Sequence, residues 1–148
     1  MNTIDKREMV FENPQINIKL KLSALWISAM FCYIYADILG LYDKWLIEEI
    51  LKGNMGPIGP LTQELKLAVA ILMSIPALMV LSCIILKPTI SRWANIVAGS
   101  LKTIAIILTL VMAFATEPWA YYVYFAVIEI TVTAYIVWCA WNWPKQNI

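Results

Sequence analysis

The sequence predicts an all-α membrane protein: a bundle of four transmembrane helices with a short interfacial helix in the outer loop between the first two. Four continuous apolar runs each reach the length of about 20 residues that a helix needs to cross a bilayer. Hydrophobic residues make up 61% of the chain and charged residues only 14%, whereas soluble domains carry about 25% charged residues. A chain of 148 residues cannot bury so much apolar surface in a core, so we expect that surface to face lipid.

The first element is a polar segment, residues 1–19, which we interpret as a cytoplasmic tail. A cleavable signal peptide would have an apolar core here, but the segment instead carries the charged residues Asp5, Lys6, Arg7, Glu8 and Glu12. The first span is predicted at residues 20–42, because the apolar run over these residues is long enough to cross the membrane as a helix.

The outer loop, residues 43–63, divides into two parts. Apolar residues recur at helical spacing over 44–52, which predicts a short helix lying on the membrane surface. Residues 53–60 contain the pairs Gly56-Pro57 and Gly59-Pro60, which are typical of turns. We therefore expect this part of the loop to fold back tightly.

The other spans are predicted at 65–86, 93–115 and 119–141, all within one membrane domain. Lys87, Pro88 and Arg92 separate the first two of these, and Glu117 with Pro118 separates the last two. Because both connections are short, the three helices should be antiparallel neighbours in chain order.

The distribution of lysine and arginine predicts that both termini are cytoplasmic. One side of the membrane receives seven basic residues: Lys6, Arg7, Lys19, Lys21, Lys87, Arg92 and Lys145. On the other side, lysines alternate with the acids of the outer loop. The basic side is the one expected in the cytoplasm.

Two charges lie near the centres of predicted spans, and they locate the candidate site. Lys102 and Glu129 each have about ten residues of span on either side. A charge at the bilayer centre costs about 3 kcal/mol on insertion scales, so neither is expected to face lipid alone. Their helices are antiparallel neighbours, which brings both charges to the midplane, where they can pair or face one polar cavity.

Other polar residues share the faces of these charges. Asn95 and Gly99 lie on the Lys102 face of the third span, and Thr133 lies on the Glu129 face of the fourth. On the first span, Tyr33 and Asp37 are one turn apart, with Asp37 near the outer boundary. Asp37 could reach outer water or join the interior, and the sequence leaves both open.

The composition excludes several classes of function. There is no histidine, which removes the commonest metal ligand and the usual base near neutral pH. The net charge of +1 gives no basis for nucleic-acid binding. Cys32, Cys83 and Cys139 are far apart and form no C-x-x-C pair. We therefore expect no metal, no cofactor and no catalytic residue.

Several motifs together resemble a known family of small bacterial four-span proteins. They are Leu22-Ser23-Ala24-Leu25-Trp26, Tyr33-Ile34-Tyr35-Ala36-Asp37-Ile38-Leu39-Gly40-Leu41, Arg92-Trp93-Ala94-Asn95-Ile96-Val97-Ala98-Gly99, and Tyr121-Tyr122 with Ile128-Glu129-Ile130. On this set the chain resembles the family of unknown function DUF6326, which is broadly DoxX-like. The resemblance implies the four-helix architecture and a bacterial inner membrane, and it brings no catalytic residue.

Three functions stay open at this point. The first is binding or passage of a small amphipathic molecule or lipid in a polar cavity inside the bundle. The second is a non-catalytic structural or accessory subunit, whose charges only lock the helices together. The third is a quinone-linked oxidoreductase subunit. Membrane lipid is the expected partner in each case, and assembly into a homo-oligomer is compatible with all three.

Overall fold

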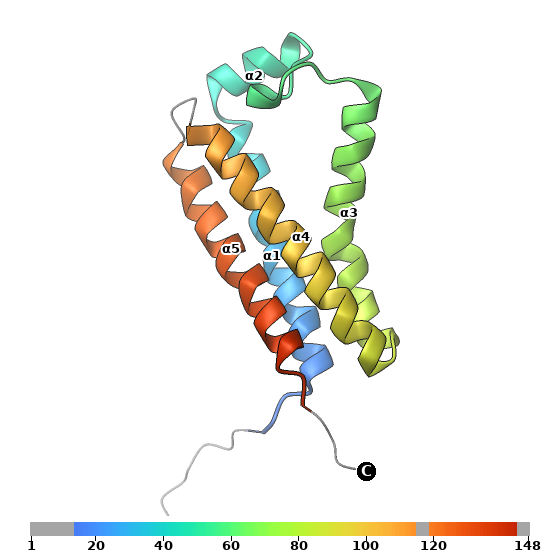
Figure 1. Ribbon diagram of the computed structural model, residues 1–148. Helices are drawn as coiled ribbons and strands as arrows, with labels where there is room; N and C mark the ends of the chain where they lie inside the picture. Colours follow the sequence, from blue (N-terminus) through green and yellow to red (C-terminus); the bar gives the residue numbers. More distant parts are fainter. Residues whose placement is uncertain (1–13, 115–118, 145–148) are drawn as a thin grey trace, which may run out of the picture.

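The computed structural model describes residues 14–114 and 119–144, and this part of the chain is all helical (Figure 1). It contains five α-helices and one 3-10 helix: α1 (Ile18–Gly40), α2 (Lys44–Leu51), η1 (Gly56–Ile58), α3 (Gln63–Ile85), α4 (Pro88–Phe114) and α5 (Ala120–Trp141). Helices α1, α3, α4 and α5 are long and apolar enough to cross a membrane. The predicted fold class is confirmed. The charged tail before residue 14, the Glu117–Pro118 connection and Lys145 lie outside the described residues.

Side-chain caps define where three of the helices begin. The side chain of Asn17 accepts a hydrogen bond from the Lys19 amide at the start of α1, and that of Asp43 accepts one from the Leu46 amide at the start of α2. Thr62 does the same for the Leu65 amide at the start of α3. Such caps satisfy backbone donors that have no partner within the helix. Each helix thus starts at a polar residue next to an apolar run.

Helix α4 begins at Pro88, five residues before the predicted span at 93–115. The apolar run marks only the part that fits inside lipid, whereas the helix itself continues through the charged turn. Proline suits a first helical position because the amide hydrogen that it lacks would have no partner there. The added turns place Arg92 on α4.

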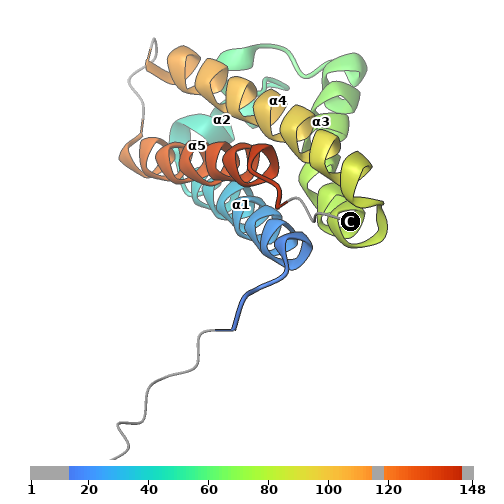
Figure 2. The ribbon, with the colours of Figure 1, turned by 60° about the horizontal axis from the view of Figure 1, so that its bottom comes forward.

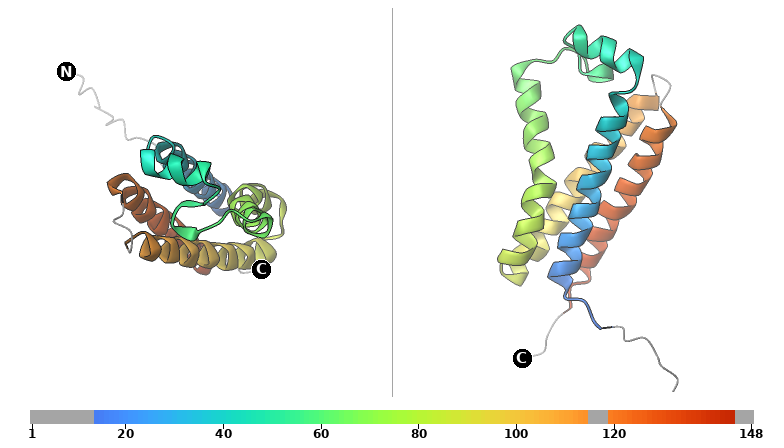
Figure 3. Two further views of the ribbon diagram at one scale, coloured as in Figure 1. Left: turned by 90° about the horizontal axis from the view of Figure 1, so that it is seen from above. Right: turned by 180° about the vertical axis from the view of Figure 1, so that it is seen from behind.

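The four long helices are not equally spaced around one centre. Helix α5 packs against both α1 and α4, and α3 packs more extensively against α1 than against α4. Figure 3 (right) shows α1 between α3 and α5. The expectation that α3 and α4 are antiparallel neighbours holds mainly near the turn that joins them, since the two helices diverge toward α2 (Figure 1).

The divergence of α3 is visible in its burial. Its buried residues, Pro76, Met79 and Cys83, all lie in its C-terminal half, and no residue from Gln63 to Ile75 is buried. We call the end of the bundle that holds α2 the α2 end, and the end that holds Asn17 and Asn142 the terminal end. The bundle is thus closed at the terminal end and more open at the α2 end on the side of α3.

Close packing of α4 on α5 depends on Gly99. A Cβ atom at this position would lie 2.8 Å from Val137 Cγ2, which is shorter than a van der Waals contact. Small residues allow two membrane helices to approach in this way. The side of α4 that meets its neighbours also buries Asn95 and Lys102, which the sequence places on the same face as Gly99, and it buries Ala113.

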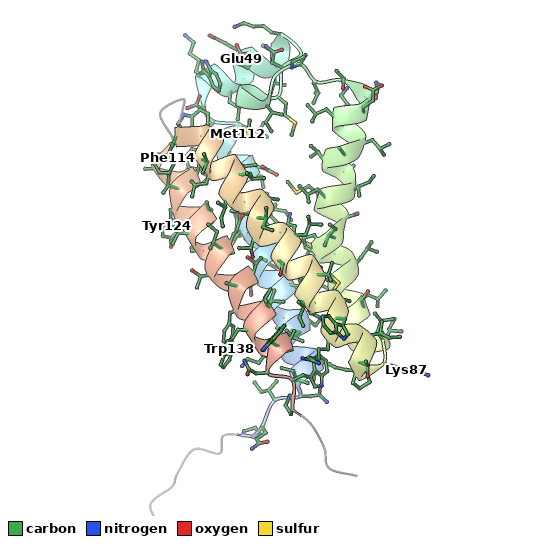
Figure 4. All side chains as sticks on the ribbon, viewed as in Figure 1. Glu49, Lys87, Met112, Phe114, Tyr124 and Trp138 are labelled. Atoms are coloured by element: carbon green, nitrogen blue, oxygen red, sulfur yellow. The ribbon has the colours of Figure 1, made fainter. Side chains whose placement is uncertain are left out.

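The outward surface of the bundle is apolar and aromatic. Phe114, Tyr124 and Trp138 project away from the other helices (Figure 4), and all three are exposed. The labelled charges lie at the two ends, with Glu49 on α2 and Lys87 at the turn between α3 and α4 (Figure 4). An apolar belt between charged ends is the pattern of a membrane-spanning bundle.

Helix α2 lies across one end of the bundle, at an angle to the long helices, and its position in the chain is that of the predicted short interfacial helix (Figures 1 and 3, left). The ring of Trp45 lies against that of Trp119, with centroids 5.6 Å apart. Beyond the helix the chain turns back, and the Leu61 amide donates to Gly53 O at 2.8 Å. Glu49 accepts hydrogen bonds from Lys52 and Asn54, which lower the pKa of its carboxyl group. This confirms the predicted tight loop.

Candidate functional site

Three polar side chains from three helices meet inside the bundle. Tyr33 comes from α1, Lys102 from α4 and Glu129 from α5, and all three are buried. Lys102 Nζ lies 4.0 Å from the centroid of the Tyr33 ring, which is a cation–π contact. The exposed fractions of Lys102 and Glu129 are only 2% and 6%. We call Tyr33, Lys102 and Glu129 the central cluster.

The two charges of the central cluster interact without a direct bond. The Lys102 side chain is within electrostatic range of the carboxyl groups of Glu129 and Asp37. Among the residues that the structure describes, however, the ion pairs with nitrogen and oxygen within 4.0 Å both lie on α2 or next to it, and Lys102 takes part in neither. Within the same residues, neither the ammonium group of Lys102 nor the carboxyl group of Glu129 makes a hydrogen bond. Lys102 and Glu129 therefore do not form a direct ion pair that would hold α4 and α5 together.

Tyr33 is the clearest sign that the central cluster is incomplete. Its hydroxyl oxygen is buried and has no hydrogen-bond partner, and it is the one such side-chain atom in the part of the chain that the structure describes. Leaving a buried polar group without a partner costs about 1–3 kcal/mol. Within the described residues, the packing of the helices therefore leaves the hydrogen-bonding capacity of this hydroxyl group unused.

Asp37 lies one turn from Tyr33 toward the α2 end, on the face of α1 that also carries the buried Trp26. Asp37 itself is exposed. The N-terminal half of α3, which could cover this face of α1, buries no residue of its own. Of the two environments that the sequence allowed, Asp37 thus combines features of each: it faces the interior side yet stays accessible.

Asn95, a predicted site residue, belongs to a separate and fully bonded network near the terminal end. Its Oδ1 atom accepts a hydrogen bond from Trp26 Nε1 at 2.8 Å, and its Nδ2 atom donates to Ser91 O at 2.8 Å. Cys83 Sγ lies 3.3 Å from both amide atoms. The network joins α1, α3 and α4, and we assign Asn95 a structural role.

Thr133, another predicted site residue, is also fully bonded. Its hydroxyl group donates to Glu129 O at 2.8 Å within α5 and accepts from Thr103 Oγ1 at 2.8 Å across the interface with α4. Thr103 Oγ1 also lies 2.8 Å from Gly99 O, which is the alternative acceptor for its single hydroxyl hydrogen. Thr133 therefore supports the backbone beneath Glu129 and leaves no group free for a ligand.

Two features of polar chemistry were missed in the sequence. Thr103 bonds to Thr133, although Thr103 is next to Lys102 in the sequence and does not share the predicted face of Asn95, Gly99 and Lys102. At the terminal end, Lys19 Nζ donates to Leu86 O at 2.5 Å and Arg92 Nε to Ala140 O at 3.2 Å. Basic residues just outside apolar runs could have signalled such contacts, because helices leave free carbonyls at their C-terminal ends.

The described residues contain no group of three histidine, cysteine, aspartate or glutamate side chains that could hold a metal ion. Their three cysteines are free. The chemistry of the central cluster is thus that of one cation, one acid and one hydroxyl group. These groups can bind the polar part of a molecule, and they can exchange hydrogen bonds or protons with it.

Four long apolar helices around a buried polar cluster define the class of protein: a multi-pass α-helical membrane protein. The chain belongs to the family of unknown function DUF6326, whose model matches residues 9–148. Neither the curated proteins nor the solved structures provide a match. The family predicted from the sequence motifs is confirmed.

Proposed function

We propose that this protein binds, or binds and passes across the membrane, a small amphipathic molecule or lipid whose polar part occupies the central cluster. The observation that carries the proposal is the buried Tyr33 hydroxyl group, which has no hydrogen-bond partner among the described residues. Beside it lies a buried ammonium group that is stacked on the tyrosine ring, and within residues 14–114 and 119–144 it has no counter-ion within 4.0 Å. A ligand oxygen could accept hydrogen bonds from both groups, while Glu129 could receive a ligand donor.

The openness at the α2 end supports a route to this cluster. The N-terminal half of α3 buries no residue, and Asp37 is exposed one turn from Tyr33. A molecule that approaches from the apolar membrane would first meet the apolar residues of α3 and then the polar groups. This order suits an amphipathic ligand, because its apolar part can stay in lipid while its polar part reaches the cluster.

The test compares two tyrosines on α1 by replacing each with phenylalanine. Tyr33→Phe removes the unpartnered hydroxyl group, and Tyr35→Phe is the matched control because Tyr35 is exposed. We expect Tyr33→Phe to keep or raise the stability of the ligand-free protein, by about 1 kcal/mol. Native mass spectrometry of protein purified in mild detergent should show that it retains much less bound lipid or small molecule than the wild type or Tyr35→Phe.

The opposite pattern would count against the proposal. If Tyr33→Phe lowers stability and retains the same bound molecules, then the hydroxyl group serves the fold through ordered water. If neither the wild type nor the variants retain a specific molecule, then the accessory-subunit hypothesis gains.

We further propose a bacterial inner membrane, both termini in the cytoplasm and a broad DoxX-like relationship, as the motifs imply. The distribution of charge supports the orientation: Lys19, Lys21, Lys87 and Arg92 lie at the terminal end, while Asp43, Glu48, Glu49 and Glu64 lie at the α2 end. Basic residues favour the cytoplasmic side, so the terminal end should face the cytoplasm.

Single cysteines test this orientation in intact cells. With Cys32, Cys83 and Cys139 replaced, a cysteine at Asn54 should react with a membrane-impermeant thiol reagent, whereas one at Thr89 should react only after the cells are opened. Asn54 lies in the loop after α2, and Thr89 is exposed in the first turn of α4. The reverse labelling pattern would show that the termini are outside.

A further inference from the structure

The terminal end carries a second polar feature, which the central cluster does not use. A pocket of about 870 Å³ opens there, between the start of α1, the start of α4 and the segment after α5. Figure 2 brings the terminal end of the bundle forward and shows that the start of α1, the end of α5 and the turn between α3 and α4 lie at this end. Three cations line the pocket, namely Lys19, Lys21 and Arg92.

These cations are held in place and are not free surface side chains. Lys19 Nζ donates to Ile84 O and Leu86 O at the end of α3, and Arg92 donates to Ala140 O and Trp141 O at the end of α5. Lys21 Nζ donates to the Tyr135 hydroxyl group at 2.7 Å. Each cation keeps further donor hydrogens, because an ammonium group has three and a guanidinium group five.

The acceptors of these bonds do not neutralise the three positive charges. All of them are neutral groups, and a helix C-terminus contributes only about half a negative charge. The starts of α1 and α4 lie at the same end and contribute similar positive partial charges. Within residues 14–114 and 119–144, the carboxylates lie either on the α2 side of the bundle or, for Glu129, near its middle. The described residues therefore give the pocket a net positive charge.

The other walls of the pocket indicate the kind of anion. Ile16, Ile18 and Trp143 line it together with the cations. Apolar walls would not stabilise a small, freely soluble anion. They would stabilise a phospholipid, because its phosphate is attached to glycerol and acyl carbons. The pocket also lies at the end of the apolar belt, at the level where lipid headgroups are found and where tryptophan is enriched.

From this arrangement we propose that the terminal end binds the phosphate headgroup of an anionic phospholipid. Lys21 and Arg92 bind the phosphate oxygens, with Lys19 beside them, and Ile16 and Trp143 contact the glycerol and the first acyl carbons. This lipid site is separate from the central cluster. It binds a lipid of the surrounding membrane at the level of the headgroups, and it does not depend on the proposed ligand inside the bundle.

The experiment measures binding of short-chain phosphatidylglycerol and phosphatidylcholine to the full chain in neutral detergent. Tryptophan fluorescence serves as the signal, since Trp143 lines the pocket. We expect phosphatidylglycerol to bind at least about tenfold more tightly, because each lysine or arginine near an anionic lipid contributes about a fivefold gain in affinity. Inorganic phosphate and glycerol 3-phosphate are tested in parallel, and both should bind much more weakly than the lipid.

Variants identify the residues that carry this preference. Lys21→Gln with Arg92→Gln should weaken phosphatidylglycerol binding by about 25-fold and phosphatidylcholine binding by much less, because the choline group already neutralises the phosphate of that lipid. Lys44→Gln with Lys66→Gln removes the same charge at the α2 end, where both side chains are exposed, and should change neither. Lys21→Arg with Arg92→Lys keeps the charge and should retain most of the affinity. Should the first double variant fail to fold, Lys21→Gln alone should still lose about fivefold.

Three results would overturn the proposal. One is equal affinity for the two lipids, and another is an equal loss in the double variant at the α2 end. The third is binding of glycerol 3-phosphate as tightly as the lipid, which would make the site one for a soluble phosphate.

Discussion

Replacing Asn95 with alanine should lower the free energy of unfolding by about 2–3 kcal/mol. The change leaves the buried Trp26 indole N–H without its acceptor, and a buried donor without a partner costs about 1–3 kcal/mol. It also removes the contacts of the amide group with Ser91 and Cys83. The midpoint of thermal unfolding in detergent measures the loss.

Asn142→Ala is the matched control for this prediction. Asn142 also donates a hydrogen bond to a carbonyl oxygen, that of Trp138, but it does so at an exposed helix end. Surface changes of this kind usually stay within about 0.5 kcal/mol. The molecules retained by folded Asn95→Ala should match those of the wild type. An Asn95→Ala variant that is fully stable yet loses a bound molecule would place Asn95 in a binding site and not in a structural network.

The spans could be predicted from the sequence because the thickness of the lipid bilayer fixes how long an apolar run must be. A helix must present about 20 apolar residues to cross, and the runs at 20–42 and 65–86 match α1 and α3 to within two residues at each end. The position of α3 could not be predicted in the same way. Whether it packs on α1 or on α4 depends on how Pro76, Met79 and Cys83 fit against neighbouring side chains, and periodicity does not contain that information.

The candidate site was predictable only in part, for a similar reason. Lys102 and Glu129 stand out because a charge in an apolar run has few tolerable environments. Asn95 and Thr133 lie on the same faces as these charges, and their partners come from other positions: Trp26 on α1 for Asn95, and Thr103 on α4 for Thr133. Spacing alone therefore cannot separate a bonded polar residue from one that lacks a partner, such as Tyr33.

The largest effects are expected for the two buried charges. Lys102→Met and Glu129→Gln should each lower the free energy of unfolding by about 3 kcal/mol, because each leaves the opposite charge buried without compensation. The double variant should recover about 1–2 kcal/mol of the summed loss, since neighbouring groups that interact are not additive. This recovery is smaller than for a direct ion pair, because the two groups attract each other without a bond.

A double-mutant cycle on thermal stability in detergent measures the recovery, with Lys44→Met and Glu48→Gln as the matched cycle on α2. That pair is exposed, with nitrogen and oxygen 3.8 Å apart, and its coupling should not exceed about 0.5 kcal/mol. If the losses at Lys102 and Glu129 simply add, the two groups are not partners. A stable double variant that no longer retains a bound molecule would show that the charges serve binding. One that retains the same molecules would show that they only hold the helices together, as in the accessory-subunit hypothesis.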